Sequence, residues 1–289
     1  MPGSERIVRL QEVGPRDGLQ NEPRALSPEA RAKLVELLVD AGLDRIQIGS
    51  FVNPRKVPQM AGTDKLWRLL THRAGIRYSA LVLNRKGLDV ALSEGIPHVE
   101  IYVSASETHS LKNSGASVQE ALEDAFEMIR VALDTKTGVT AGVMCAFGCF
   151  YEGPVPVNKV VEMVRALDYD ESLEIGLADT PGLAEPEGIR RVLEAVKEIV
   201  SVERLAVHLH DTRGFGMANL RTALDMGVRG FDTAIGGLGG CPFIPGARGN
   251  ISTEQTVRFL ESLDFHTGVN LAKLEQIRED LARMLGRPL

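Results

Sequence analysis

Short apolar runs alternate along the chain with segments whose apolar residues recur every three or four positions. Runs of this length and composition are typical of strands buried on both faces, as in a parallel sheet. They lie at residues 7–13, 43–49, 76–83, 98–103, 139–145, 173–178, 204–210 and 230–235. The pattern therefore predicts eight strands, each followed by an amphipathic helix.

The helix predicted after the first strand has clear ends in the sequence. Ser27 suits its N-cap, Pro28 suits its first turn, and Gly42 suits its C-terminal end. The corresponding segments farther along are 64–71, 87–94, 118–133, 157–167, 186–199, 217–226 and 252–260. A polar stretch at 104–117 predicts a loop, and one more helix is predicted at 271–285.

The repeated strand–helix unit decides the predicted fold class. Units that recur at intervals of about 25 to 40 residues indicate a parallel α/β fold. We expect one domain over residues 1–289, a closed (β/α)8 TIM barrel with a C-terminal helical extension at about 264–289. An open, doubly wound sheet is the alternative, although the G-x-G-x-x-G motif of dinucleotide-binding sheets does not follow the first strand.

Composition narrows the class of partner and compartment. The chain has 289 residues, of which 44% are hydrophobic and 25% charged, as is ordinary for a globular protein. Its net charge of −6 disfavours a nucleic-acid or anionic-membrane surface. Three cysteines are too few for a disulfide framework. Because no signal-peptide or membrane-spanning run is present, we expect a cytoplasmic protein.

Polar side chains gather where the predicted strands end. The C-terminal ends of the strands form the active site of a (β/α)8 barrel. In this chain those ends carry Glu12, Arg16, Asp17, Gln20, Gln47, Ser50, Asn84, Lys86, Ser104, Cys145, Asp179, His208, His210, Arg213, Cys241 and Asn250. The opposite ends, as at 42–43 and 75–76, carry no comparable groups. The sequence therefore predicts chemistry at one end of the barrel only.

Two histidines on the seventh predicted strand suggest a metal site. His208 and His210 are two residues apart, so their side chains point to the same face of the strand. With Asp17 and Asn250 they offer two imidazoles, a carboxylate and an amide oxygen, which suits a divalent cation with open positions. We expect Mg²⁺ or Mn²⁺, with Zn²⁺ or Co²⁺ as alternatives. The competing interpretation is a hydrogen-bonded histidine pair without a metal.

Two further side chains suit the chemistry of such a site. Arg16 can donate paired hydrogen bonds to an enolate or carboxylate oxygen, or it can form a local ion pair with Asp17. Cys241 follows a glycine-rich stretch at 236–240, which predicts a mobile loop. Its thiol is a candidate proton donor or acceptor, and the alternative is an inert cysteine.

Motifs at many of these positions occur in a fixed order along the chain. They are Glu12-Val13-Gly14-Pro15-Arg16-Asp17-Gly18-Leu19-Gln20-Asn21-Glu22, Ser50-Phe51-Val52-Asn53-Pro54, Val57-Pro58-Gln59-Met60, Tyr151-Glu152-Gly153, Asp179-Thr180, His208-Leu209-His210-Asp211-Thr212, Gly236-Gly237-Leu238-Gly239-Gly240-Cys241-Pro242, Gly249-Asn250, Thr253-Glu254 and His266-Thr267-Gly268-Val269-Asn270. Together they resemble the 3-hydroxy-3-methylglutaryl-CoA lyase family of barrel metallolyases.

The resemblance implies a role for most of the candidate residues. It implies metal ligands at Asp17, His208, His210 and Asn250, and catalytic or neighbouring groups at Arg16, Cys241, Asp179 and Glu254, with Asp179 or His208 as a base acting through water. The implied reaction is a retro-Claisen-type cleavage of an acyl-CoA to acetyl-CoA and acetoacetate, as in leucine degradation. Substrate contacts are then expected from Arg16, Gln20, Gln47, Ser50, Gly176 and Arg213, and CoA contacts from Asn84, Lys86, His109 and Lys112. A homodimer is also implied by the resemblance.

The chain departs from the family pattern around the metal residues. Gln47 stands where the family has Glu, Gly176 where it has Ser, and Arg213 where it has Tyr. A related diacid, such as citramalyl-CoA yielding pyruvate and acetyl-CoA, is therefore an alternative substrate. Two competing functions are a condensing synthase of the isopropylmalate type and a non-catalytic binding protein.

Overall fold

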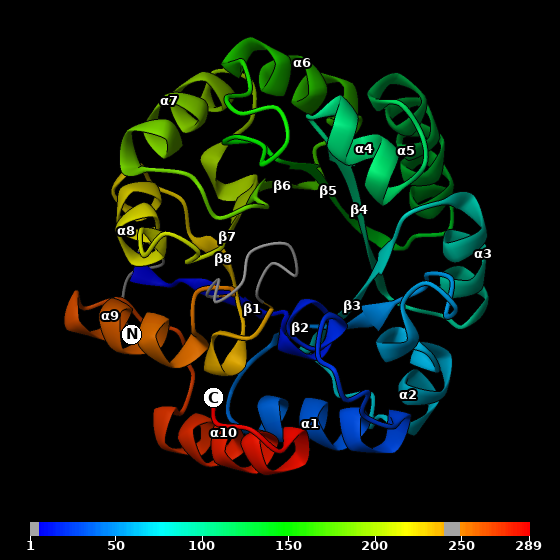
Figure 1. Cartoon of the computed structure of the whole chain (residues 1–289), viewed down its shortest axis with the longest axis vertical. Coiled ribbons are helices and arrows are strands. Elements are labelled where there is room, and N and C mark those ends of the chain that lie inside the picture. The colour runs from blue at the N-terminus through cyan, green and yellow to red at the C-terminus, as the bar shows by residue number, and fades with distance from the viewer. Residues whose placement is uncertain (1–5, 240–248) are drawn as a thin grey trace.

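Eight parallel strands form a closed barrel in the computed structural model, which describes residues 6–239 and 249–289 (Figure 1). Their order around the barrel is their order along the chain, and β1 pairs with β8 to close it. The strands are β1 (Arg9–Glu12), β2 (Arg45–Ser50), β3 (Arg77–Val82), β4 (His98–Ser104), β5 (Gly138–Met144), β6 (Glu174–Asp179), β7 (Leu205–Leu209) and β8 (Gly230–Thr233). The predicted closed barrel is confirmed, and the open sheet is wrong.

Helices surround the strands as an outer ring (Figure 1). They are α1 (Pro28–Asp40), α2 (Thr63–Leu69), α3 (Arg85–Ser93), α4 (Glu107–Asn113), α5 (Val118–Asp134), α6 (Val157–Leu167), α7 (Pro186–Lys197), α8 (Gly216–Asp225), α9 (Thr253–Ser262) and α10 (Leu271–Leu285). The helical extension α10 contacts α1 and α9. Within the described ranges, no helix has the length and apolar character needed to span a membrane.

Local sequence signals explain where several of these helices begin. Ser27 Oγ accepts a hydrogen bond from the Ala30 N–H at 3.2 Å, and Pro28 occupies the first turn of α1. At α5, Ser117 and Glu120 form a reciprocal capping box. These caps satisfy N–H groups that have no partner inside the helix. The predicted starts at Ser27 and near residue 118 are therefore confirmed.

The loop predicted at 104–117 is wrong, because it contains the short helix α4. Ser106 caps this helix by accepting a hydrogen bond from the His109 N–H at 3.1 Å. Among its seven residues only Ser110 is buried, so no apolar periodicity marks the helix in the sequence. The turn nevertheless has a functional consequence, since it carries His109 and Asn113 to the wall of the main cavity.

Charged residues also fill the N-terminal end of the barrel lumen, which the sequence at 42–43 and 75–76 did not indicate. Arg45 at the start of β2 donates to Glu174 Oε2 at 2.7 Å. Arg77 at the start of β3 donates to Glu174 Oε1 at 2.9 Å and to Gln11 Oε1 at 2.7 Å. Burial raises the pKa of Glu174, but Arg77 and Arg45 together lower it to about 2. This cluster therefore holds β1, β2, β3 and β6 together through ionised side chains.

Candidate active site and metal centre

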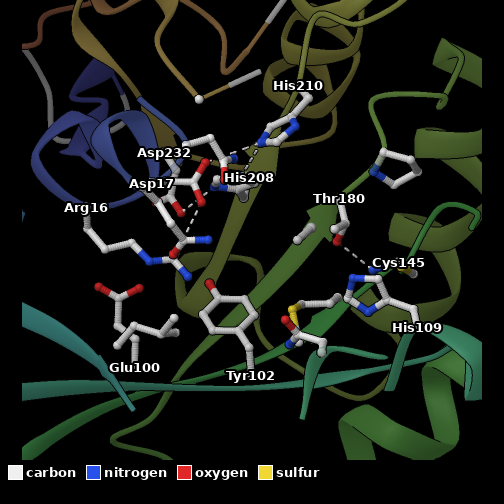
Figure 2. A pocket seen from close by; sticks show the side chains of 18 of the residues that line it. Arg16, Asp17, Glu100, Tyr102, His109, Cys145, Thr180, His208, His210 and Asp232 are labelled. Carbon is white, nitrogen blue, oxygen red and sulfur yellow. Dashed lines mark hydrogen bonds and ion pairs between the residues drawn. The ribbon is translucent and has the colours of Figure 1, made fainter. Parts of the chain in front are cut away.

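A cavity of about 230 Å³ opens among the C-terminal ends of the strands (Figure 2). It is lined by several residues that the sequence predicted for the site: Arg16, Asp17, Gln20, Gln47, His109, His208 and His210. The first and seventh strands thus bring their terminal residues to one space, as the barrel order requires.

The buried carboxylate of Glu12 fixes the turn that carries Arg16 and Asp17. It accepts hydrogen bonds from the backbone N–H of Gly14 at 2.8 Å and of Ile235 at 2.9 Å, and from the Thr253 hydroxyl at 2.6 Å. Burial raises the pKa of Glu12 to about 8, against the effect of these hydrogen bonds. Glu12 therefore joins the segments that follow β1 and β8 beneath the cavity.

Asp17, His208 and His210 form a cluster with the spacing of metal ligands. Their candidate ligand atoms all lie within 4.8 Å of one another. The two Nε2 atoms are 3.0 Å apart, and His210 Nε2 is 3.5 Å from Asp17 Oδ2 (Figure 2). Neighbouring ligands about 2.1 Å from an octahedral ion would be about 3 Å apart. The cluster therefore fits one divalent cation without rearrangement of its backbone.

Asn250, the fourth metal ligand predicted from the sequence, lies beside this cluster. An isolated β-bridge pairs its backbone with that of His210. Its Nδ2 donates to Asp17 Oδ2 at 2.8 Å and to the Leu238 carbonyl at 2.9 Å. Its Oδ1 is buried and has no hydrogen-bond partner among the described residues. A buried carbonyl oxygen without a partner is costly in a folded protein, and a bound cation would satisfy it.

Asp232 on β8 orients His208, although the sequence did not single it out. Its Oδ2 lies 3.1 Å from His208 Nδ1, so a proton on Nδ1 leaves the Nε2 lone pair facing His210. Burial lowers the pKa of His208, but the bond to Asp232 and the charge of Asp17 raise it to a net value above the ordinary one. The site thus has the carboxylate–histidine arrangement common behind metal ligands.

We expect Asp232→Asn to weaken the binding of a divalent cation by about 10- to 100-fold, because the amide no longer fixes the tautomer of His208. Titration calorimetry of the metal-free protein measures this change. Asp225→Asn on the exposed face of α8 is a matched control and should leave the affinity unchanged. An unaltered affinity in Asp232→Asn would remove Asp232 from the metal centre.

Arg16 lies beside Asp17 with its guanidinium toward the cavity (Figure 2). The two side chains form a close ion pair and are only 15% and 17% exposed. Burial raises the pKa of Asp17, but Arg16 and the two histidines lower it far more, so Asp17 stays ionised. Arg16 Nε has no partner in the described part of the chain. Arg16 therefore forms the predicted ion pair while its side chain also lines the cavity.

Two other predicted catalytic residues, Asp179 and Glu254, lie outside the cavity lining. Asp179 is buried and accepts from the N–H groups of Leu183 and Ala184, each at 3.1 Å. Glu254 accepts from the Gly236 N–H at 3.1 Å and supports the segment after β8. Cys241 lies outside the described residues.

The predicted substrate contacts divide into two groups. Gln20 and Gln47 line the cavity, and Gln47 Nε2 donates to Glu100 Oε2 at 2.6 Å. The remaining members of the predicted set have different surroundings. Ser50 is buried, Gly176 lies under the Tyr102 side chain, and Arg213 forms an ion pair with Glu185 at 3.1 Å on the surface.

The predicted CoA contacts are also dispersed. His109 lines the main cavity, while Asn84 caps α3 and lines a smaller cavity of about 80 Å³. Lys112 lies 5.1 Å from the centre of the Tyr151 ring, which lines the main cavity. Lys86 is exposed on α3. Of the four, His109 and Lys112 are therefore the two placed at the main cavity.

Three polar residues of the cavity escape prediction because they lie within strands. Glu100 and Tyr102 alternate on β4, and Asp232 lies within β8. The barrel architecture directs attention to strand ends, where none of the three is found. A usable signal was present, since a carboxylate inside an apolar strand is expensive to bury without a specific partner.

The family is decided by comparison with known proteins. The HMGL-like family model matches residues 7–281. The chain belongs to the HMGL-like family. A relative from Pseudomonas aeruginosa, named 3-hydroxy-3-isohexenylglutaryl-CoA/hydroxymethylglutaryl-CoA lyase, is 39% identical over 97% of this chain and 93% of its own length. The hydroxymethylglutaryl-CoA lyase of Pseudomonas mevalonii is 40% identical with the same two coverages.

Solved structures of the family share the whole fold. The HMG-CoA lyase of Bacillus subtilis superimposes with a TM-score of 0.94 at 39% identity, covering 98% of this chain and 95% of that chain. An HMG-CoA lyase from Acinetobacter baumannii, solved in complex with coenzyme A and 3-methylmalate, gives 0.93 at 35% identity, covering 100% and 94%. The family resemblance seen in the motifs is thus confirmed.

Proposed function

We propose that this protein is a metal-dependent carbon–carbon lyase that cleaves a 3-hydroxy-3-methylglutaryl-CoA-like substrate to acetyl-CoA and acetoacetate. The supporting observation is the cluster of Asp17, His208 and His210, with Arg16 beside it in one cavity. Relatives that carry this activity in their names match almost the full chain.

The proposed cation is Mg²⁺ or Mn²⁺. Asp17, His208, His210 and the Asn250 carbonyl would hold it, and this mixture of nitrogen and oxygen ligands also admits Zn²⁺ or Co²⁺. When bound, such a cation polarises substrate oxygens and stabilises negative charge on them.

The protein's own side chains account for two further needs of the cleavage. The departing acyl-CoA enolate needs hydrogen-bond donors at its oxygen, and Arg16 has a guanidinium at the cavity. The substrate hydroxyl also needs a proton acceptor, and the resemblance implies Asp179 or His208 acting through water. Asp179 is buried outside the cavity lining, and each of its oxygens accepts a backbone N–H, whereas His208 lines the cavity. His208 is therefore the better placed of the two.

A second substrate, citramalyl-CoA, is favoured by one observation. Tyr102 occupies the space beside Gly176, where the family pattern has a serine. Citramalyl-CoA is one methylene shorter between its hydroxyl-bearing carbon and its free carboxylate. A cavity narrowed at this wall suits the shorter diacid.

We expect the purified protein to cleave at least one of these two acyl-CoA compounds and to lose that activity in excess chelator. Adding back Mg²⁺ or Mn²⁺ should restore it, because chelation removes the ion and not the side chains that would hold it. Acetyl-CoA and the keto acid are measured by mass spectrometry. Full activity in chelator would contradict the metal role, and cleavage of neither compound would contradict the substrate class.

A further inference from the structure

The Tyr102 ring lies across two glycines on the inner face of the barrel. Tyr102 on β4 pairs with Gly142 on β5, and Gly142 pairs with Gly176 on β6. A Cβ at Gly142 would overlap the ring edge, and a Cβ at Gly176 would overlap Tyr102 Oη. The three residues therefore form one row, in which two missing side chains make room for one phenol.

The row places the phenol at the wall of the main cavity. Tyr102 and Glu100 alternate with the buried Ile101 and Val103, so they face the lumen. Tyr102 lines the main cavity together with Arg16 (Figure 2). Its hydroxyl points up from the ring toward the end of the Arg16 side chain (Figure 2).

The Tyr102 hydroxyl is available to donate a hydrogen bond to a ligand. No hydrogen bond from it to another residue occurs within the ranges 6–239 and 249–289. Burial, followed by the nearby carboxylates Asp232 and Glu100, raises the pKa of Tyr102 well above its ordinary value. The group is therefore a protonated donor throughout the neutral range.

Glu100 lies two residues before Tyr102 on β4 and also faces the lumen. It accepts hydrogen bonds from Gln47 at 2.6 Å, Ser79 at 2.6 Å and Gln11 at 3.1 Å. The carboxylate absent from position 47 on β2 is thus present two strands away, at Glu100 on β4. Unlike Tyr102, however, Glu100 is fully buried and its oxygens already have protein partners. Glu100 holds Gln47 in place, whereas Tyr102 remains free to contact a ligand.

We propose that Tyr102 is a specificity-determining residue whose hydroxyl donates a hydrogen bond to the free carboxylate of the acyl-CoA substrate. This inference rests on the proposed lyase function. In this proposal the Tyr102 hydroxyl on β4 replaces the hydroxyl of the serine that the family has at position 176 on β6. The Tyr102 ring also shortens the cavity on the side of Gly176. Arg16, which lines the same cavity, remains available for the enolate oxygen of the departing acyl-CoA.

The test compares Tyr102→Phe with the parent protein on 3-hydroxy-3-methylglutaryl-CoA and citramalyl-CoA. Loss of a hydrogen bond to a charged group should lower kcat/KM by about 10- to 100-fold on the substrate that the parent cleaves best, mainly through KM. The melting temperature should stay unchanged, since the hydroxyl has no protein partner among the described residues. Tyr169→Phe, on an exposed ring packed only against Phe126 among the described aromatics, is the matched control.

A second set of variants places a serine hydroxyl at position 176 on β6 instead of the Tyr102 hydroxyl on β4. Gly176→Ser alone should impair cleavage because its side chain overlaps Tyr102, whereas Gly176→Ser with Tyr102→Ala has room for a serine. The double variant should recover activity over Tyr102→Ala and shift the preference toward the longer 3-hydroxy-3-methylglutaryl-CoA. An unchanged kcat/KM in Tyr102→Phe, or a lowered melting temperature with an unchanged ratio between substrates, overturns the proposal.

If the parent protein cleaves neither compound, a binding measurement tests the Tyr102 contact instead. The same variants are then titrated with 3-hydroxy-3-methylglutarate, a free hydroxy diacid, by calorimetry in the presence of Mg²⁺. Binding by the parent that weakens about tenfold or more in Tyr102→Phe keeps the carboxylate contact and rejects only the lyase function. Equal affinities, or no binding by the parent, reject the Tyr102 contact itself.

Discussion

Asp17→Asn is expected to reduce cleavage by about a thousandfold or more. The substitution keeps the shape of the side chain but removes the only carboxylate from a cluster whose other described members are two imidazoles. Loss of roughly 4 kcal/mol of transition-state stabilisation corresponds to about three powers of ten in rate. Steady-state kinetics with saturating Mg²⁺ or Mn²⁺ measure the effect, and calorimetry should show weakened metal binding.

Asp17→Asn also leaves the Arg16 guanidinium without its ion-pair partner, so stability must be measured alongside. His210→Ala removes a different ligand and leaves the Arg16–Asp17 pair intact, and it should produce a similar loss of activity. Asp225→Asn serves as the surface control. Near-parent turnover in both ligand variants would contradict the assignment of the metal centre.

Arg16→Gln should lower kcat by about 100- to 1,000-fold while metal binding persists. That range is typical for removal of one donor to a developing oxyanion, and glutamine cannot replace a charged, forked donor. Substrate affinity should change less than kcat if the contact strengthens during bond cleavage.

Two further variants separate the effect of the Arg16 charge from that of its forked geometry and from a nonspecific effect of losing an arginine. Arg221→Gln alters an exposed arginine paired with Asp225 on α8 and should behave as the parent. Arg16→Lys keeps the positive charge but not the fork, and an intermediate kcat is expected. A fall in metal affinity equal to the fall in kcat would place Arg16 in metal binding instead of enolate stabilisation.

The barrel could be predicted because its signal is repeated along the chain. Eight apolar runs with amphipathic segments between them admit few folds, and α6 and α10 begin and end where the periodicity places them. The helix α4 escaped prediction because a seven-residue turn with one buried residue has no periodicity to detect. The lumen charges escaped too, since Arg45 and Arg77 resemble ordinary polar residues at strand starts until Glu174 is placed opposite them.

The candidate site was predictable where residue type and strand position agree. Asp17, His208 and His210 come together as expected. Asp17 follows β1 and the two histidines lie at the end of β7, and only β8 separates these strands in the closed barrel. Tyr102 and Gly176 could not be linked in advance, since their contact depends on the register of three strands. A glycine in a strand indicates that another group approaches closely, but not which group.

The ion cluster of Arg45, Arg77 and Glu174 at the N-terminal end of the lumen affects how the chain folds. Arg45 and Arg77 belong to the first half of the barrel, and their partner Glu174 belongs to the second. A folding intermediate made of β1 to β4 alone would lack the ion pairs that both guanidinium groups form with Glu174. Half-barrels of this chain should therefore be poorly populated, and closure should coincide with the arrival of β6. Separately expressed halves should acquire stable structure only when they are mixed.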